Sequence, residues 1–184
     1  MNNMCRLLIL DINGILCYKT SKNTEVGREL NFIELNSYRV VMRPGLPEFL
    51  KFCYDNFMVA FFSSTHYVNA NAILEHILTP DQRKATIFFW FRDHTHFDPD
   101  YGKDASIKDH DTIKRLDDVL ECPTINWNRR YNSSNTILCD DSEKKTRFND
   151  NKNIIIFESF TGDERDTFLN NVTDELIQRF DEIA

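Results

Sequence analysis

Four short stretches of the chain carry side chains that could act together on a phosphoryl group. They lie far apart in the sequence, yet each contains residue types that attack, hold or neutralise such a group. The candidates are Asp11, Asn13, Ser63, Ser64, Lys114, Asp140 and Asp141. A carboxylate can attack phosphorus and divide one difficult displacement into two easier steps. Hydroxyl and ammonium groups can hold phosphate oxygens and offset the charge of the transition state.

The elements that precede these residues decide whether they can meet. Short apolar runs rich in β-forming residues predict buried strands at residues 6–10, 58–62, 86–91, 135–139 and 153–157. Helical spacing between the runs predicts helices at residues 47–54, 68–78, 112–120 and 142–148. Because strands and helices alternate, we expect an α/β fold with a doubly wound, mainly parallel sheet. A last helix at residues 163–183 carries apolar side chains on one face and is expected to pack against the sheet.

Two stretches interrupt the alternation. Residues 15–42 predict a β-rich flap after the first strand, and residues 91–111 predict a polar loop rich in Asp and His. No linker, repeat or low-complexity segment divides the chain. Residues 1–184 are therefore expected to form a single domain.

The predicted sheet explains how the candidate residues can meet. In open parallel sheets, ligands bind beyond the carboxyl ends of the strands. Asp11, Ser63 and Asp140 each directly follow a predicted strand, and Lys114 near a predicted helix start adds a cation. Asp11 is the candidate nucleophile. Because neighbouring carboxylates repel one another, Asp11, Asp140 and Asp141 predict an oxygen-ligated Mg²⁺ site.

The order of these motifs resembles that of a known superfamily. Asp11-Ile-Asn-Gly-Ile-Leu, Ser63-Ser, Lys114 and Asp140-Asp resemble, in this order, the four motifs of the haloacid dehalogenase superfamily. Two longer segments resemble the phosphatase domain shared by RNA polymerase II C-terminal-domain phosphatases and NLI-interacting-factor-like proteins. They are Arg43-Pro-Gly-Leu-Pro-Glu-Phe-Leu and Asn135-Thr-Ile-Leu-Cys-Asp-Asp-Ser-Glu-Lys-Lys. The resemblance extends over residues 5–160.

This resemblance implies a role for each candidate residue. Asp11 would be the nucleophile and would bind Mg²⁺ together with the main-chain carbonyl of Asn13 and with Asp141. Asp140 is not part of this implied set, and its place in the carboxylate cage rests on the chemistry of neighbouring carboxylates given above. Ser63 and Lys114 would contact the phosphate, with Ser64 beside them.

The same resemblance implies an open site. Members of this branch have no large cap domain, and the short distance from Gly14 to Ser63 leaves no room for one. An uncapped site admits a phosphorylated side chain of a protein, whereas a small metabolite usually requires enclosure that excludes water. The expected substrate is therefore phosphoserine or phosphothreonine in a protein.

Asn13 departs from the family pattern. Active relatives usually carry a second Asp there, which protonates the leaving oxygen and later activates water. An amide does neither, and general acid–base catalysis is typically worth about 10²- to 10⁴-fold in rate. Three functions follow: a slow Mg²⁺-dependent protein phosphatase, an inactive scaffold that binds a phosphorylated or extended protein segment, or a small-molecule phosphohydrolase closed by residues 91–111.

Several assignments have alternatives. Lys103 and Lys108 lie on the same approach as Lys114 and could replace it. His66, three residues after Ser63, is an alternative proton donor. The histidines and acids of residues 93–104 match no compact set of metal ligands, so we expect a solvated loop that borders the substrate groove.

Composition limits the partners and the compartment. The net charge of −7, without a local basic patch, argues against nucleic acid and anionic membranes as partners. Five cysteines without a CxxC pair suit a reducing compartment. The apolar runs are too short to cross a bilayer, and residues 1–4 do not begin a signal peptide. The expected location is the cytoplasm or the nucleus, and the sequence does not specify an oligomeric state.

Overall fold

The computed structural model describes residues 5–22 and 31–184. Residues 1–4, on which the signal-peptide expectation rests, lie outside the described residues, as do residues 23–30 of the predicted flap. Along the described parts of the chain, no helix has the length and apolar character that a membrane crossing requires.

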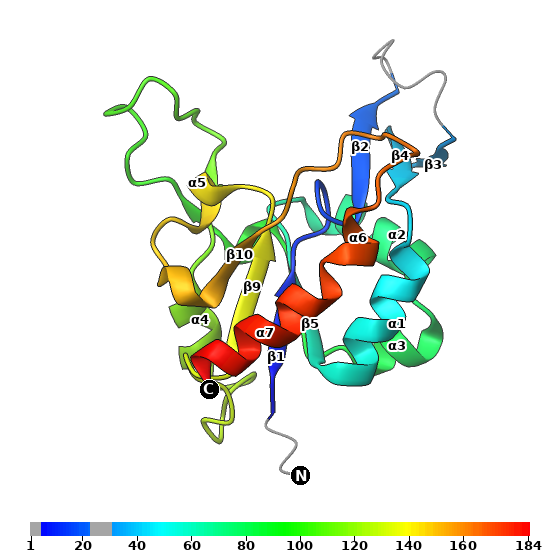
Figure 1. The fold of residues 1–184 in the computed structure, drawn as a ribbon. Coiled ribbons are helices and arrows are strands. Elements are labelled where there is room, and N and C mark those ends of the chain that lie inside the picture. The colour runs from blue at the N-terminus through cyan, green and yellow to red at the C-terminus, as the bar shows by residue number, and fades with distance from the viewer. Residues whose placement is uncertain (1–4, 23–30) are drawn as a thin grey trace.

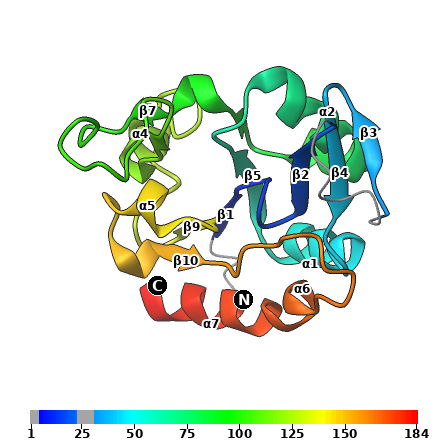
Figure 2. The ribbon, with the colours of Figure 1, turned by 90° about the horizontal axis from the view of Figure 1, so that it is seen from above.

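A parallel sheet of five strands forms the centre of the fold (Figure 1). Its strands, in spatial order, are β10 (Ile154–Ile156), β9 (Thr136–Asp140), β1 (Leu7–Leu10), β5 (Met58–Phe62) and β6 (Phe89–Trp90). Every neighbouring pair is parallel, and β1 lies between β9 and β5 (Figure 2). This confirms the predicted fold class, because each strand falls within or close to a predicted apolar run.

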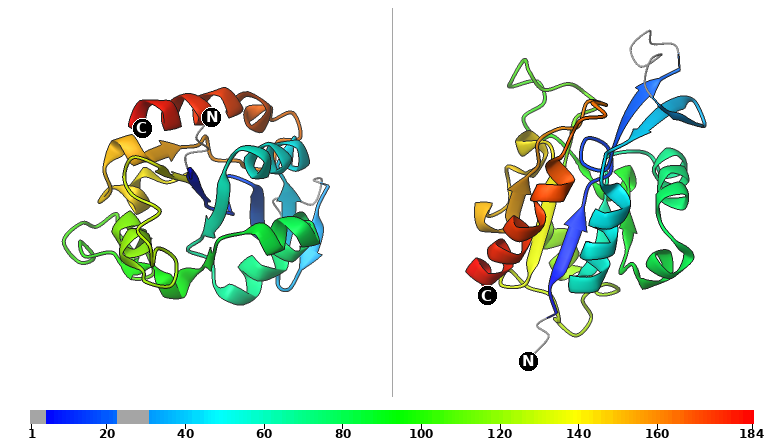
Figure 3. Two further views of the ribbon diagram at one scale, coloured as in Figure 1. Left: turned by 90° about the horizontal axis from the view of Figure 1, so that it is seen from below. Right: turned by 45° about the vertical axis from the view of Figure 1, so that its right-hand side comes forward.

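Helices cover both faces of the sheet (Figure 3). One apolar cluster joins alternate strand residues such as Leu8 and Phe61 to α1 (Leu46–Asn56), α2 (Tyr67–Ile77) and α7 (Thr173–Ile183). A second cluster joins the intervening strand residues to α4 (Leu116–Glu121). Successive strand side chains point to opposite faces, so both clusters draw on the same strands.

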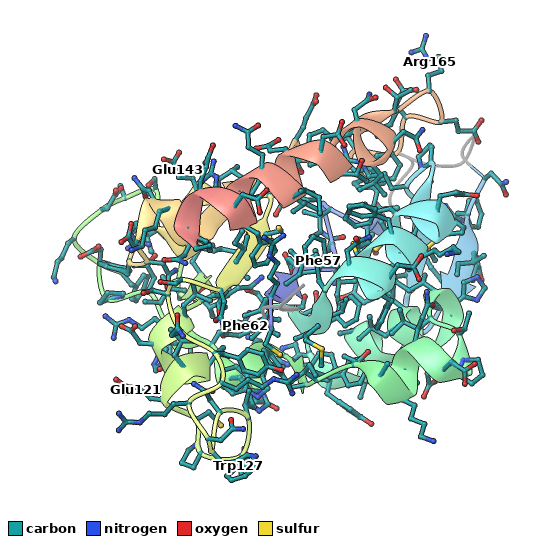
Figure 4. The ribbon with its side chains drawn as sticks, turned by 60° about the horizontal axis from the view of Figure 1, so that its bottom comes forward. Phe57, Phe62, Glu121, Trp127, Glu143 and Arg165 are labelled. Atoms are coloured by element: carbon teal, nitrogen blue, oxygen red, sulfur yellow. The ribbon has the colours of Figure 1, made fainter. Side chains whose placement is uncertain are left out.

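Figure 4 shows how single aromatic side chains belong to these two clusters. Phe57 lies in the first cluster and Phe62 in the second, and both are buried in the interior. Trp127, which is 80% exposed, lies at the edge of the molecule. Because both faces of the sheet are buried, its strands are almost uniformly apolar and do not alternate with polar residues.

The flap and the polar loop both project from the end of the sheet to which the strands point (Figure 1). The flap is rich in β-structure, as predicted: in its described part, β2 (Cys17–Ser21), β4 (Tyr38–Met42) and β3 (Ile33–Leu35) form an antiparallel sheet. The polar loop begins with η1 (Arg92–His94) and β7 (His96–Phe97), and it returns through β8 (Thr112–Ile113).

Two predicted helices begin later than expected. The helix predicted at residues 112–120 begins at Leu116, because Thr112 and Ile113 pair with β7. The last helix, predicted at residues 163–183, begins with α6 (Phe168–Asn171) and continues as α7. The Asp166 carboxylate accepts a hydrogen bond from the Phe168 amide and pairs with Arg43, so the residues before Phe168 form turns.

Short helices complete the structure. The helix predicted at residues 142–148 is reduced to α5 (Glu143–Thr146), and η2 (Asn151–Asn153) precedes β10. One helix, α3 (Pro80–Ala85), was not predicted. Its sequence signal is a capping box, in which the Thr79 hydroxyl accepts from the Gln82 amide while the Gln82 side chain accepts from the Thr79 amide.

Candidate active site

Strand register brings the candidate carboxylates to one edge of the sheet. Leu10 at the end of β1 is in register with Phe61 of β5 and with Cys139 of β9. The residue after Leu10 is Asp11, whose amide donates to the Cys139 carbonyl at 3.0 Å. Asp11 therefore lies beside Asp140, although the two residues are far apart in the sequence.

Asp11, Asp140 and Asp141 form a compact group of carboxylates, which we call the carboxylate triad. One oxygen from each lies within 4.8 Å of the others. Asp11 and Asp140 are buried, with 2% and 0% of their surface exposed. Buried like charges at this separation repel strongly unless cations lie among them.

Lys114 supplies the first of these cations. Its Nζ atom donates to Asp140 Oδ2 at 2.5 Å and lies 3.1 Å from Asp11 Oδ1. The main chain of Lys114 is fixed on both sides, since its amide donates to the Lys145 carbonyl and its carbonyl accepts from the Asn149 side chain, each at 2.8 Å. Lys114 thus enters the site from the end of β8, just before α4, where a helix start had been predicted.

Lys145 supplies a second cation that the sequence analysis did not identify. Its Nζ atom lies 3.8 Å from Asp11 Oδ2, 3.8 Å from Asp140 Oδ1 and 3.7 Å from Asp141 Oδ1. Burial alone would lower the pKa of Lys145, but the three surrounding carboxylates together raise it above the ordinary value. The ammonium group is therefore charged and lies within ion-pair distance of all three acids of the carboxylate triad.

The two lysines separate the protonation behaviour of the two buried acids. Burial raises the pKa of Asp11, but Lys114, Lys145 and hydrogen bonds outweigh it, so that the pKa lies below its usual range. Burial raises the pKa of Asp140 to about 6 against the effect of Lys114, and the charge on Asp11 adds to the rise. Asp11 is thus the better ionised of the two, as a nucleophile must be.

The loop after β1 brings Asp141 close to the backbone. Gly14 has φ +89°, and a Cβ atom built on it would lie 1.9 Å from Asp141 Oδ2. That oxygen accepts a hydrogen bond from the Ser159 hydroxyl at 2.8 Å. A side chain at position 14 would therefore displace Asp141 from the carboxylate triad.

The Asn13 side chain is held in a fixed orientation. Its Oδ1 atom accepts a hydrogen bond from the Lys19 amide at 2.9 Å. The Asn13 Nδ2 group can donate a hydrogen bond, but an amide transfers no proton near neutral pH. A carboxylate at this position could accept the same bond from Lys19.

The two serines after β5 have different surroundings. Ser63 is buried, its amide donates to the Trp90 carbonyl, and its hydroxyl helps to lower the pKa of Asp11 after the larger effects of burial and the two lysines. Ser64 accepts a hydrogen bond from the Thr112 hydroxyl at 3.1 Å. Ser64 also lines a cavity of about 210 Å³, which it shares with Lys144 and Lys145.

Two orphaned oxygens bear on whether the carboxylate triad fits a metal ion. Asp11 Oδ1 and Asp141 Oδ1 are buried and receive no hydrogen bond from any described residue. A lysine ammonium group lies 3.1 Å from the first and 3.7 Å from the second. Such oxygens are costly to bury unless a cation binds them. Together with the oxygen-only donor set, they fit a hard divalent cation such as Mg²⁺.

The remaining histidines and lysines named in the sequence analysis lie apart from the carboxylate triad or are engaged elsewhere. His94 accepts from the Phe91 amide at 3.3 Å, and His96 contacts Asp118 at 2.8 Å. His66 precedes α2 and is exposed. Lys103 is exposed and pairs with Asp100, and Lys108 is also exposed. Among the described residues, the carboxylate triad is the group of acids, histidines and cysteines that has metal-ligand spacing.

The polar loop is tied to α5 by charged pairs. Arg147, at the end of α5, donates to both carboxylate oxygens of Asp98 at 2.8 and 2.6 Å and to Asp100 at 2.8 Å. Lys144 donates to Asp111 at 2.7 Å. Asp98, Asp100 and Asp111 are thus bound by cations of the protein itself, and Asp98 is buried where a solvated loop had been expected.

Comparison with known proteins decides the family. The profile of the family described as NLI interacting factor-like phosphatase matches residues 6–183. The chain belongs to this family. An uncharacterized FCP1 homology domain-containing protein of Schizosaccharomyces pombe is 33% identical over 148 residues, which are 76% of this chain and 55% of that protein. The chain thus spans about half the length of this curated relative.

Two solved structures share the fold of this chain. A variant of the fission yeast RNA polymerase II CTD phosphatase Fcp1, bound to beryllium fluoride, matches with a TM-score of 0.55 and 14% identity, covering 98% of this chain and 52% of that chain. A structure of Fcp1, an essential RNA polymerase II CTD phosphatase, matches with a TM-score of 0.56 and 16% identity, covering 98% and 49%. At this identity the likeness shows the fold, which is the mainly parallel haloacid dehalogenase fold.

Three residues at the site of this NLI interacting factor-like domain were missed by sequence reasoning. They are Lys145, Ser159 and Asn149, which contact the carboxylate triad or fix Lys114. The sequence offered one signal, because Lys145 lies four residues after Asp141 and can reach it across a helical turn. Ser159 and Asn149 come from loops whose paths the sequence pattern does not predict.

Proposed function

We propose that residues 1–184 form one phosphatase domain that hydrolyses phosphoserine or phosphothreonine in a protein, with Mg²⁺ as cofactor. The observation that carries the proposal is the geometry around Asp11. Its ionised carboxylate is buried beside Lys114 and near the Ser63 hydroxyl, at the open edge of the sheet. Attack of Asp11 on phosphorus would form an aspartyl phosphate, which water then hydrolyses.

Charges at the site favour a phosphoryl ligand once a metal is present. Asp11, Asp140 and Asp141 carry three negative charges, which Lys114 and Lys145 offset only in part. Bound between the carboxylate triad and the Asn13 carbonyl, Mg²⁺ would supply the missing positive charge and polarise the phosphoryl oxygens. Lys114 and the Ser63 hydroxyl would then hold phosphate oxygens in line with Asp11.

The open edge of the sheet supports a protein substrate. The flap and the polar loop project from this edge (Figure 1), and the elements of the described residues include no cap domain. Fcp1, whose structure has the same fold, is described as an RNA polymerase II CTD phosphatase, and its substrate is thus a protein segment. A small-molecule phosphohydrolase would require the polar loop to close as a lid, yet Arg147 and Lys144 tie this loop to α5.

Asn13 favours a second candidate function. Its fixed amide cannot supply the proton that the leaving oxygen needs, so the domain would be a slow enzyme or a scaffold that binds phosphorylated segments without turnover. His66 is exposed before α2, and its replacement would test it as a substitute acid. The fold and the phosphate site are compatible with either function.

Asn13→Asp separates the two functions. The Lys19 amide can donate to either side chain, so the variant is expected to fold like the natural chain. We expect phosphate release from a phosphoserine peptide to rise about 10²- to 10⁴-fold, with a smaller rise for p-nitrophenyl phosphate, whose leaving group needs little protonation. The assay measures inorganic phosphate with and without Mg²⁺.

Asp11→Asn is the control in the same assay. It should abolish Mg²⁺-dependent release in both backgrounds, and surviving activity would contradict Asp11 as the nucleophile. If the natural chain releases no phosphate and Asn13→Asp does, the result would favour the scaffold. If neither protein releases phosphate, the result would contradict the phosphatase proposal.

A further inference from the structure

Lys145 occupies an unusual position among the charged groups of the site. Its ammonium group lies 3.7–3.8 Å from one oxygen of each member of the carboxylate triad. These are the same three residues whose oxygens lie within 4.8 Å of one another. A divalent cation bound by the triad would therefore lie against the same carboxylates as Lys145, and the two positive charges would repel each other.

Lys145 differs from Lys114 in its freedom to move. The Lys114 side chain has no exposed surface and is held by Asp140 at 2.5 Å. The Lys145 side chain is 31% exposed, and all three of its carboxylate contacts exceed hydrogen-bond distance. Lys145 also lines the cavity of about 210 Å³ that Ser64 borders. Its flexible four-carbon stem can thus swing toward Ser64 without disturbing the core.

We propose that Lys145 is an exchangeable cation: Mg²⁺ displaces its ammonium group from the carboxylate triad, and the displaced group then binds oxygens of the phosphate. This inference rests on the proposed Mg²⁺ site. Without metal, Lys145 limits the repulsion among three acids that Lys114 cannot neutralise alone. With metal, the carboxylate triad no longer needs Lys145.

The charge balance explains why the displaced group would move to the phosphate. Three carboxylates, two lysines and one Mg²⁺ leave one net positive charge, and a bound phosphate dianion makes the site negative again. Lys145 lines the same cavity as Ser64, which is one of the residues expected to contact the phosphate. A charge-assisted hydrogen bond from its ammonium to a phosphate oxygen is stronger than one between neutral groups.

Lys145→Met tests the exchange through binding, without reliance on turnover. Methionine keeps the unbranched stem as far as the Cε position and removes the ammonium group with its charge. We expect the affinity of the variant for Mg²⁺ to be at least about tenfold higher than that of the natural chain, because the competing charge is gone. In saturating Mg²⁺, inorganic phosphate should bind about tenfold more weakly, because one charged contact is lost. Isothermal titration calorimetry measures both affinities.

Two further variants make the test specific. Lys145→Arg keeps the charge and should restore the Mg²⁺ affinity of the natural chain. Lys144→Met removes a charge from the neighbouring residue, which pairs with Asp111 and not with the carboxylate triad. Its Mg²⁺ affinity should change less than about twofold, since the charge lies farther away and is screened.

The thermal midpoint provides a second measurement if Lys145→Met requires Mg²⁺ to fold. The rise in the midpoint with Mg²⁺ should be larger for this variant than for the natural chain. Equal Mg²⁺ affinities in the natural chain and in Lys145→Met would overturn the exchange, as would an absence of Mg²⁺ binding by the natural chain. Phosphate release is measured separately, and its absence in every variant would contradict the phosphatase proposal. A rise in Mg²⁺ affinity together with a fall in phosphate affinity in Lys145→Met would still support the exchange.

Discussion

Gly14→Ala should reveal how closely the nucleophile loop is fitted to Asp141. Gly14 lies in the left-handed region at φ +89°, and a Cβ atom there would lie 1.9 Å from Asp141 Oδ2. No real structure tolerates such a distance, so either the loop or the Asp141 side chain must shift. The change therefore adds backbone strain and also displaces one member of the carboxylate triad.

Each contribution has an expected size. A non-glycine residue in the left-handed region costs about 1–2 kcal/mol. Displacement of Asp141 also breaks its hydrogen bond with the exposed Ser159 hydroxyl, which is worth about 1 kcal/mol. The free energy of unfolding should therefore fall by about 2–3 kcal/mol, which corresponds to a loss of about 4–12 °C in the thermal midpoint of a domain of this size.

Gly102→Ala is the matched control, because the chain offers a second glycine with nearly the same φ. Gly102 has φ +82°, and a Cβ atom on it would have no neighbour within 4 Å. Gly102→Ala should lower the free energy of unfolding by no more than the backbone strain. Urea unfolding with and without Mg²⁺ distinguishes the two variants: Mg²⁺ should stabilise Gly102→Ala as it does the natural chain, and Gly14→Ala much less. If the two variants lose the same free energy of unfolding and are stabilised equally by Mg²⁺, the steric argument is refuted.

Two further predictions concern the buried Arg43, which donates to Asp166 and to the carbonyls of Ile15 and Glu158. Arg43→Met leaves these acceptors without their donor, so the free energy of unfolding measured in urea should fall by about 3–5 kcal/mol. A fall below about 1 kcal/mol would contradict this role. Burial raises the pKa of Asp166, but hydrogen bonds from Arg43 and the backbone outweigh it, so that the folded pKa lies below its ordinary 3.8. The pair therefore stabilises the protein at pH values above the unfolded-state pKa of Asp166. The natural chain should have a higher free energy of unfolding than Asp166→Asn there, and this difference should vanish as the pH falls through the folded-state pKa. A difference that persists at lower pH would contradict the assignment.

The sequence predicts the sheet well because its strands are buried on both faces. An apolar run such as residues 58–62 is then unmistakable and coincides with β5. Residues after these runs fall at one edge for geometric reasons, so that Asp11, Ser63 and Asp140 could be expected together. Their roles in catalysis and metal binding stay predictions.

What the sequence does not predict is the direction of short elements between the strands. Lys144 and Lys145 are alike in the sequence, and only the orientation of α5 turns one toward Asp111 and the other toward the carboxylate triad. Lys114 was expected near a helix start, yet it follows β8, whose pairing with β7 depends on contacts across the polar loop. Such pairings depend on tertiary contacts and leave no periodic pattern.

The short helix α5 also makes the two sides of the site thermodynamically dependent on each other. Arg147 and Lys144 bind acids of the polar loop, while Lys145, between them in sequence, contacts the carboxylate triad. A ligand that shifted the loop through these ion pairs would move α5 and thereby change the free energy of cation binding proposed for the triad. By reciprocity, a cation bound at the triad changes the affinity of the loop for that ligand by the same factor. Through these contacts, a helix of four residues would couple recognition of the proposed substrate to the ionic state of the site.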